Sequence, residues 1–290
     1  MDLLSDVIGV MRVGRPALSL EVADPGWQTA APVFEGARCY VVTAGCVRVT
    51  GPGLPKTGSS SITGPGDATV TLQVGDAVLV PHGTAHTLVN PTDGVARFLS
   101  GAYRMDQARP HPLFHDLPDL VGLPSRPDRY PSLHASIELV RGELDEQMYG
   151  RDVVLPALLD VLLVYLIRAC LSERAQSQAT GWCTALTDEV IARSLRAVHE
   201  RPAEAWTVAS LGAFAGLSRA AFARRFTAMV GQPPLTYLTW WRLTLAARLL
   251  QTTDLPLSAV EQRSGYGSAY AFANAFKREY GMSAGRYRHQ

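Results

Sequence analysis

Two similar stretches decide the fold of this 290-residue chain: LSRAAFARRFTAMVG (residues 217–231) and GSAYAFANAFKREYG (residues 267–281). At an offset of 50 positions their serines, phenylalanines and final glycines coincide. The matched pairs are Ser218 and Ser268, Phe222 and Phe272, Ala223 and Ala273, Phe226 and Phe276, Gly231 and Gly281, and, just beyond, Tyr237 and Tyr287. An internal repeat sets the architecture of a region. We therefore expect one structural unit to occur twice in the last quarter of the chain.

Each copy predicts a capped amphipathic helix. A serine at the first position can accept hydrogen bonds from the free amides of the first turn. Phenylalanines four residues apart share one face of a helix. The opposite face carries Ala220, Arg224 and Thr227 in the first copy, and Tyr270, Asn274 and Lys277 in the second. An aromatic buried side with a polar outer side is what a helix in a DNA major groove requires.

A shorter helix and a glycine turn precede each copy. Apolar residues at helical spacing lead first to the turn at 215–217 and then to the turn at 264–266. A short helix, a glycine turn and a capped second helix form a helix-turn-helix. The alternative is a plain helical bundle whose repeat reflects packing alone. Outward cationic and amide side chains in both copies favour two tandem helix-turn-helix units.

The region from about Trp206 to Tyr287 resembles the AraC/XylS transcription regulators. The stretch GYGSAYAFANAFKREYGMSAGRYR, which starts at Gly265, is similar to the C-terminal signature of that family. The resemblance implies two helix-turn-helix subdomains joined by a long helix, here in PLTYLTWWRLTLAARLLQTTDLPLSAV (residues 234–260). It also implies that the two recognition helices enter successive major grooves of double-stranded DNA, about 34 Å apart.

Specific DNA contacts can be predicted on these helices. Arg224 and Asn274 are the expected base readers, because arginine pairs bidentately with guanine and asparagine with adenine. Tyr270 is expected to contact a thymine methyl group or a phosphate. Contacts to phosphate set the register of a protein on DNA but not its sequence preference. The expected phosphate ligands are Arg219, Arg225, Lys277, Arg278 and Arg286, and Ala220 and Ala223 are small contacts that leave fewer bases to be read by the first helix.

The charge of the chain is divided unevenly. From residue 182 onward there are 13 basic and 7 acidic residues, whereas the preceding part has 14 basic and 19 acidic ones. A basic module joined to an acidic one suits a nucleic-acid binder with a separate regulatory domain. Affinity for DNA is expected to fall as the salt concentration rises.

The N-terminal region, from Ala17 to about Tyr103, consists of short β-type runs separated by glycine and proline, which predicts a small antiparallel barrel or sandwich. Residues 51–67 are expected to form a flexible loop. The stretch GDAVLVPHGTAH (residues 75–86) resembles the second motif of the cupin barrel. That resemblance covers roughly residues 5–125 and implies an effector-sensing domain, because AraC-type regulators often carry such a cupin. The predicted strands are 17–22, 37–43, 46–50, 68–72, 77–80 and 96–102.

The residues expected to contact a small-molecule effector are Arg38, Tyr40, His82 and His86. Arg38 would favour a carboxylate, or it is a surface charge, since alternation alone does not fix the inward face. A catalytic metal centre and a cofactor are not expected. Residues 31–45, where metallocupins place their first ligands, contain no histidine, and Arg38 stands about where a glutamate ligand would.

Two other arrangements could still hold an ion. His82 and His86 could bind one with Cys39, and His111 could bind one with His115, four residues further on. The alternative places the first pair at the barrel rim and the second on a surface segment, and we prefer it.

Helices are predicted at residues 2–11, 134–142 and 153–171. In the last, leucines at 155, 159, 162 and 166 repeat like a coiled-coil seam, and further apolar residues widen the surface. One side is expected to cover the barrel and the other to contact a second subunit, so a homodimer is predicted; burial within the monomer is the alternative. Pro156, Asp160 and Arg168 argue against a membrane span. Residues 172–181 are the expected hinge.

These patterns predict an α+β chain of two domains. Residues 1–175 form a cupin-like antiparallel barrel with dimerisation helices at about 132–172, and residues 182–290 form an all-α double helix-turn-helix domain. The expected function is sequence-specific transcription regulation under control of an effector, without enzymatic activity, with RNA polymerase as a further partner. The four cysteines form no CxxC pair and no signal peptide is recognised, so a cytoplasmic location is expected. The alternatives are a constitutive regulator with a dimerisation-only barrel, a metal-dependent sensor, and a cupin enzyme fused to a DNA-binding module.

Overall fold

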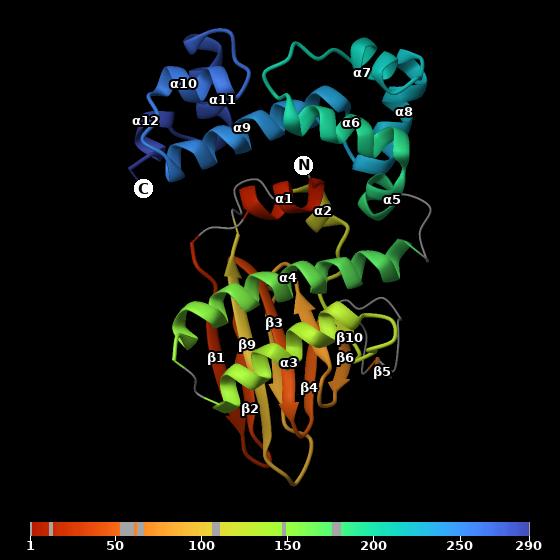
Figure 1. Ribbon diagram of the computed structural model, residues 1–290, viewed down its shortest axis with the longest axis vertical. Helices are drawn as coiled ribbons and strands as arrows, with labels where there is room; N and C mark the ends of the chain where they lie inside the picture. The colour runs from red at the N-terminus through yellow and green to blue at the C-terminus, as the bar shows by residue number, and fades with distance from the viewer. Residues whose placement is uncertain are drawn as a thin grey trace. The chain divides into compact units, whose positions relative to one another are not determined.

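The computed structural model describes residues 2–11, 14–52, 61–62, 67–105, 111–146, 149–175 and 181–289 (Figure 1). Most of the predicted loop at 51–67 lies outside these residues. The chain divides into two compact units. The β unit comprises Arg12–Gln107 and Phe114–Ser177. The helical unit comprises Met1–Met11, Ala108–Leu113 and Gln178–Gln290, so two short segments from the N-terminal half lie with the C-terminal helices.

The described part of the β unit contains two five-stranded antiparallel sheets, which confirms the predicted strand-rich domain. Their strand orders are β1-β9-β3-β7-β10 and β2-β8-β4-β6-β5. The strands β2, β5, β8 and β10 were not predicted; they are short and lack a long alternating pattern. The strands are β1 (Ala17–Ala23), β2 (Gln28–Ala31), β3 (Gly36–Ala44), β4 (Val47–Pro52), β5 (Ser61–Ile62), β6 (Asp67–Leu72), β7 (Ala77–Val80), β8 (His86–Val89), β9 (Ala96–Arg104) and β10 (Val121–Leu123).

Strand β3 is buried on both faces. Tyr40 and Val42 contribute to an apolar core with residues of both sheets, among them Val49, Leu88 and Phe98. Because successive side chains of a strand point to opposite faces, Cys39 points the other way. A Cβ atom built on Gly101 of the neighbouring strand would lie 2.8 Å from the Cys39 sulfur and 3.3 Å from Leu159. The outer face of this sheet is therefore covered by the helix that carries Leu159.

That helix is α4 (Arg151–Ala175), which lies with α3 (Pro131–Glu146) across the sheet (Figure 1). The four leucines of the predicted seam, at 155, 159, 162 and 166, are all buried within the β unit. Burying one leucine fully contributes roughly 1.5–3 kcal/mol, so this side of α4 is part of the monomer's core. By length and composition, the segment Arg151–Glu173 is also long and apolar enough to cross a membrane.

The helical unit confirms two helix-turn-helix pairs joined by a long helix. The first pair is α7 and α8, the second is α10 and α11, and α9 connects them (Figure 1). Its helices are α1 (Leu3–Met11), α5 (Trp182–Thr187), α6 (Glu189–Glu200), α7 (Val208–Phe214), α8 (Arg219–Val230), α9 (Pro234–Thr252), α10 (Leu257–Arg263), α11 (Ala269–Tyr280) and α12 (Ala284–Tyr287), and α2 (Pro112–His115) begins at the end of the segment 108–113.

The predicted caps are present in both copies. Ser218 accepts a hydrogen bond from the Ala221 amide at 3.3 Å, and Ser268 accepts one from the Ala271 amide at 3.2 Å. Both recognition helices end at a left-handed glycine, Gly231 with φ 81° and Gly281 with φ 71°. The amide of each glycine donates the final hydrogen bond of its helix, and glycine adopts this conformation without the strain that a Cβ atom would bring. Local chemistry therefore sets both ends of each recognition helix.

The two copies differ in their turns. The first turn joins α7 to α8 through residues 215–218, whereas the second joins α10 to α11 through residues 264–268. In each turn a glycine with positive φ follows the first helix, Gly216 at 72° and Gly265 at 81°. The next amide then bonds back to the first helix, from Leu217 to the Gly212 carbonyl and from Tyr266 to that of Glu261. The extra residue is Gly267, so the second turn is one residue longer.

Candidate nucleic-acid interface

The predicted DNA contacts lie on the outer sides of the recognition helices. Phe222 and Phe226 of α8 and Phe276 of α11 are fully buried, and Phe272 is nearly so. Their burial fixes the rotation of each helix and leaves the opposite side free. Tyr270 is 80% exposed. The other predicted contacts are exposed at Arg219, Ala220, Arg224, Arg225, Asn274, Lys277, Arg278 and Arg286, and half-buried at Ala223.

Arg225 has a partner that the sequence analysis did not identify. Its guanidinium is ion-paired with the carboxylate of Asp188, which also accepts a hydrogen bond from the Ile191 amide at 2.9 Å and so caps α6. Burial acts to raise the pKa of Asp188, but the Ile191 amide and the Arg225 guanidinium outweigh it and lower that pKa. Arg225 thus joins α8 to the start of α6, a structural role that is separate from its predicted contact with phosphate.

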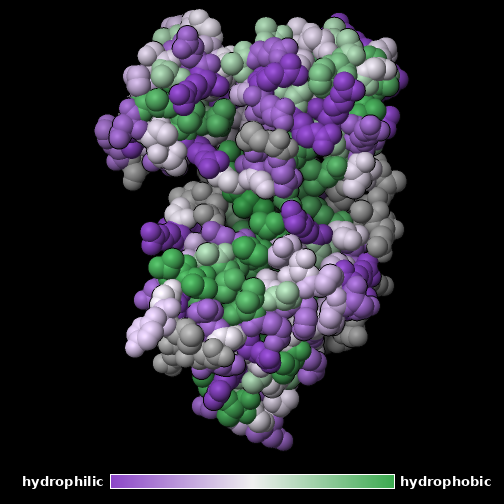
Figure 2. Space-filling view, viewed as in Figure 1, coloured by the Kyte–Doolittle hydropathy of each residue, from purple (hydrophilic) through white to green (hydrophobic). Residues whose placement is uncertain are grey.

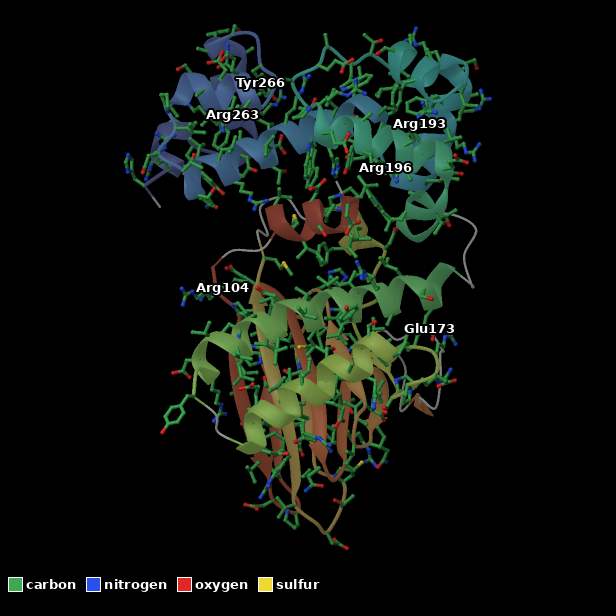
Figure 3. The ribbon with its side chains drawn as sticks, viewed as in Figure 1. Arg104, Glu173, Arg193, Arg196, Arg263 and Tyr266 are labelled. Atoms are coloured by element: carbon green, nitrogen blue, oxygen red, sulfur yellow. The ribbon has the colours of Figure 1, made fainter. Side chains whose placement is uncertain are left out.

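Other basic residues lie exposed on the helical unit. Figure 3 labels Arg193 and Arg196 on α6 and Arg263 on α10, and all three are exposed. The guanidinium of Arg193 lies over the Phe214 ring, 4.8 Å from its centroid. These residues contribute to the positive charge expected of the C-terminal part of the chain, and no individual role is predicted for them. Arg242 belongs to the framework instead, because it donates to the backbone carbonyls of Pro202 and Glu204 at 2.7 and 2.8 Å.

Inside the β unit, Tyr40 and His86 form a buried polar pair. His86 Nδ1 lies 2.7 Å from the Thr84 carbonyl oxygen, which can only accept, so Nδ1 carries the proton. His86 Nε2 then accepts from the Tyr40 hydroxyl at 2.8 Å. Burial raises the pKa of Tyr40 to about 12 and lowers that of His86. Both groups are therefore neutral at physiological pH.

Two family models match separate parts of the chain. A cupin family model matches residues 2–172, and a helix-turn-helix domain model matches residues 211–290. A putative AraC-like transcription regulator of Streptomyces antibioticus is 37% identical over 204 residues, which cover 68% of this chain and 67% of that protein. The chain belongs to the AraC family of transcription regulators.

Two further similarities complete the comparison of this AraC-family regulator. The HTH-type transcriptional regulator AlkR of Acinetobacter baylyi is 30% identical over 266 residues, covering 80% of this chain and 85% of AlkR. The solved DNA-binding domain of AdpA, in complex with a target DNA, is 36% identical with a TM-score of 0.33. It covers 34% of this chain and 88% of that domain. The family assignment makes this chain a DNA-binding regulator with a cupin-like domain.

The regulator brings together part of the predicted effector site. Arg38 lies near Tyr40, where its positive charge partly offsets the effect of burial on the Tyr40 pKa, and its guanidinium is 5.0 Å from the centre of the Phe34 ring. His82 has a different neighbour, because its Nε2 lies 2.9 Å from the Leu117 carbonyl oxygen. Arg38, Tyr40 and His86 therefore form one polar cluster, while His82 is held by the backbone that follows α2.

Among the described residues of this AraC-family regulator, Cys39 is not brought together with His82 and His86. Cys39 points to the other face of β3, away from Tyr40, where burial raises the pKa of its thiol to about 12. No group of three His, Cys, Asp or Glu side chains able to hold a metal occurs among the described residues. The expectation that His111 lies on a surface segment is wrong: His111 is fully buried among aromatic rings of the helical unit. The His115 side chain lies outside the described residues.

Proposed function

We propose that this AraC-family regulator changes its transcriptional activity when a small carboxylate binds inside the cupin-like barrel. The observation that carries this proposal is the cluster of Arg38, Tyr40 and His86, which places a cation, a hydroxyl and a neutral imidazole beside an otherwise apolar core. Buried polar groups are costly unless they are paired. A ligand carboxylate would pair with Arg38, and Tyr40 and His86 would orient it.

The test is a thermal-shift screen of the full chain against small organic acids, their amides and divalent metals. A ligand at 100 times its Kd stabilises the folded state by about 2.7 kcal/mol. We expect stabilisation by an acid but not by its amide, and loss of the effect in Arg38→Met. Stabilisation by zinc, nickel or iron alone would favour the metal-dependent sensor or the cupin enzyme. No stabilisation by any compound would favour a constitutive regulator whose barrel only dimerises.

The regulator binds DNA through the two recognition helices in this proposal. Arg224 and Asn274 read bases, and Tyr270 contacts a thymine methyl group or a phosphate. The support is their exposure on the sides of α8 and α11 opposite the buried phenylalanines. The phosphate contacts in this proposal are made by Arg219, Arg225, Lys277, Arg278 and Arg286, and the protein acts in the cytoplasm, where DNA and RNA polymerase are present. Effector binding shifts the equilibrium between two arrangements of the domains only if the effector binds one arrangement more tightly than the other.

A second copy of the chain is the proposed partner of α4. Its inner leucines are buried in the monomer, but its outer side carries exposed apolar residues, including Val154 and Val161. Leu139 of α3 is exposed by 59% on the same pair of helices. Figure 2 shows apolar side chains gathered over α3 and α4. An apolar surface of this kind favours association with another protein surface, and a homodimer supplies an identical one.

A further inference from the structure

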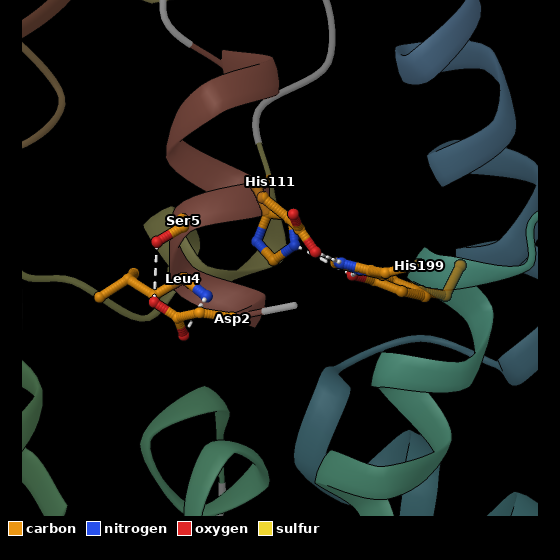
Figure 4. A network of polar contacts seen from close by, with 7 residues as sticks. Asp2, Leu4, Ser5, His111 and His199 are labelled. Carbon is orange, nitrogen blue, oxygen red and sulfur yellow. Dashed lines mark hydrogen bonds and ion pairs between the residues drawn. The ribbon is translucent and has the colours of Figure 1, made fainter.

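A buried chain of polar side chains runs through the helical unit. The His111 Nε2 lies 3.2 Å from the Tyr237 hydroxyl, and that hydroxyl lies 2.6 Å from His199 Nε2. His199 Nδ1 lies 3.4 Å from a carboxylate oxygen of Asp6. Figure 4 shows this network at close range. It joins four segments of the sequence: α1, the residues before α2, α6 and α9.

The direction of each hydrogen bond in this network follows from the bond at its His111 end. The Leu113 amide donates to His111 Nδ1 at 2.9 Å, so the proton of neutral His111 is on Nε2. That N–H donates to the Tyr237 hydroxyl, which donates to His199 Nε2. His199 Nδ1–H then donates to Asp6. All four imidazole nitrogens and the Tyr237 hydroxyl thereby have partners with both imidazoles neutral, as their burial requires.

The chain of hydrogen bonds supports recognition helix α8 at two points. The Tyr237 ring packs on the Phe226 ring of α8, with centroids 5.9 Å apart. The His111 ring lies edge-on to the Trp182 ring at 4.4 Å, and the Trp182 indole N–H donates to the carbonyl of Val230, the last residue of α8, at 3.2 Å. His111 and Tyr237 therefore contact the residues that hold the middle and the end of the helix that carries Arg224.

Two members of this network belong to segments that continue directly into the β unit. Asp6 is on α1, which ends at Met11, and the β unit begins at Arg12. His111 is in the segment 108–113, which is flanked on both sides by residues of the β unit. Asp2 fixes the first turn of α1 by accepting from the Leu4 amide at 3.3 Å and the Ser5 hydroxyl at 2.8 Å (Figure 4). A displacement of α1 would therefore act on His199 through Asp6, and a displacement of residues 111–113 would act on Tyr237 through His111.

The second helix-turn-helix is supported from within. Tyr287 occupies the position that corresponds to Tyr237 in the repeat. Its hydroxyl accepts a hydrogen bond from Gln251 of α9 at 3.2 Å, and its ring packs on Phe276 and Tyr280. The two recognition helices thus rest on equivalent tyrosines, of which Tyr237 is bonded to the histidine that precedes α2.

We propose that Asp6, His111, His199 and Tyr237 are positioning residues for α8, and that α1 and residues 111–113 transmit the state of the barrel to the first helix-turn-helix. Transmission rests on the proposed effector-sensing function, whereas the positioning of α8 does not. The second helix-turn-helix then contributes a DNA affinity that does not change when the effector binds. Control of transcription comes from the strength of the contacts that α8 makes.

The first experiment compares Tyr237→Phe with Tyr287→Phe in the full chain, on an operator selected from random DNA. Each variant keeps its ring and loses one hydroxyl. We expect Tyr237→Phe to weaken operator binding three- to tenfold and to flatten base preference only in the half-site read by α8. Amide exchange, measured by mass spectrometry, should accelerate in α8 and not in α11. Tyr287→Phe should affect the other half-site and α11. Equal changes in both half-sites, or none in Tyr237→Phe, would overturn the proposal.

A second pair of variants separates positioning from general loss of folding. His111→Gln can keep a donor near the Tyr237 hydroxyl, whereas His111→Phe keeps an aromatic ring but removes the bond. We expect His111→Gln to bind the operator within about twofold of the wild type. His111→Phe should weaken operator binding as much as Tyr237→Phe does, by an amount typical of the loss of one buried hydrogen bond. Identical behaviour of the two variants would contradict a role for the hydrogen bond.

Transmission is tested separately with the acid found in the thermal-shift screen. The wild type is expected to change α8 exchange when that acid binds, and His111→Phe is expected to bind the acid without that change. A response of α8 that survives in His111→Phe would overturn transmission through this segment. If no acid binds the wild type, the effector proposal fails, while the Tyr237 and His111 variants still decide the positioning of α8.

Discussion

The guanidinium of Arg225 on recognition helix α8 is ion-paired with the carboxylate of Asp188, whose side chain caps α6. The cap satisfies the Ile191 amide, and the ion pair ties the first helix-turn-helix to the helix before it. Asp188 is only 9% exposed, whereas Arg225 is 43% exposed. Because exposed ion pairs contribute little, the cap is the larger part of this arrangement.

We expect Asp188→Ala to destabilise the protein by about 1 kcal/mol, the usual cost of losing an N-cap. Asp188→Asn is the matched control, since asparagine caps a helix as well as aspartate but carries no charge. Urea unfolding of both variants measures the difference. Equal destabilisation of the two would show that the ion pair, and not the cap, dominates.

Loss of a base reader should be specific to sequence. We expect Arg224→Ala and Asn274→Ala each to weaken operator binding by about 1–3 kcal/mol and to relax preference at one base pair. Arg219→Ala is the control: removal of a phosphate contact weakens binding to all sequences alike and reduces the salt dependence. Titrations on the selected operator and on scrambled DNA give both values. A loss for Arg224→Ala that is equal on scrambled DNA would make Arg224 a phosphate contact.

The outer side of α4 predicts the oligomeric state. Val161, 43% exposed near the middle of the helix, should be buried in a dimer, so Val161→Glu is expected to produce monomers. Burying an unpaired carboxylate in an apolar interface is strongly unfavourable. Val33→Glu is the control, because Val33 is 74% exposed in the segment between β2 and β3. Sedimentation velocity distinguishes the species, and a Val161→Glu variant that remains dimeric would place the interface elsewhere.

Stability should fall as the pH drops below about 6.5. Burial lowers the pKa of His86 in the barrel and of His199 in the helical unit, and Asp6 and Glu200 only partly offset this at His199. The unfolded chain then binds more protons than the folded protein, so the free energy of unfolding rises with pH in this range. The contribution is complete above the unfolded pKa of 6.5 and is lost as pH falls below it.

Urea unfolding at pH 7.5, 6.5 and 5.5 measures this dependence. A double variant, His86→Gln with His199→Gln, should have a flatter profile than the wild type over that range, because neither glutamine titrates. A wild-type stability that is constant or increases toward pH 5.5 would contradict the prediction.

Much of the helical unit could be predicted because its signals are local. Ser218 and Gly231 set the ends of α8 through neighbouring amides and carbonyls, and Phe222 and Phe226 define the buried face by spacing alone. The long strands of the β unit were also predictable, since apolar runs between turns have few other conformations available. The strand β8 was not, because its four residues begin at His86 and carry no distinctive alternation.

The sequence by itself determined the repeated helix-turn-helix, the outward sides of α8 and α11 and the strand-rich N-terminal domain. Only the tertiary structure decided which leucines of α4 face the sheet, that Cys39 and Tyr40 lie on opposite faces of β3, and that His111 is buried. It also decided the pairs Tyr40 with His86, 46 residues apart, His111 with Tyr237, 126 apart, and Asp6 with His199, 193 apart. Capping and helical spacing act between neighbours in the chain, whereas a buried polar partner is selected by the packing of distant segments, which no local pattern encodes.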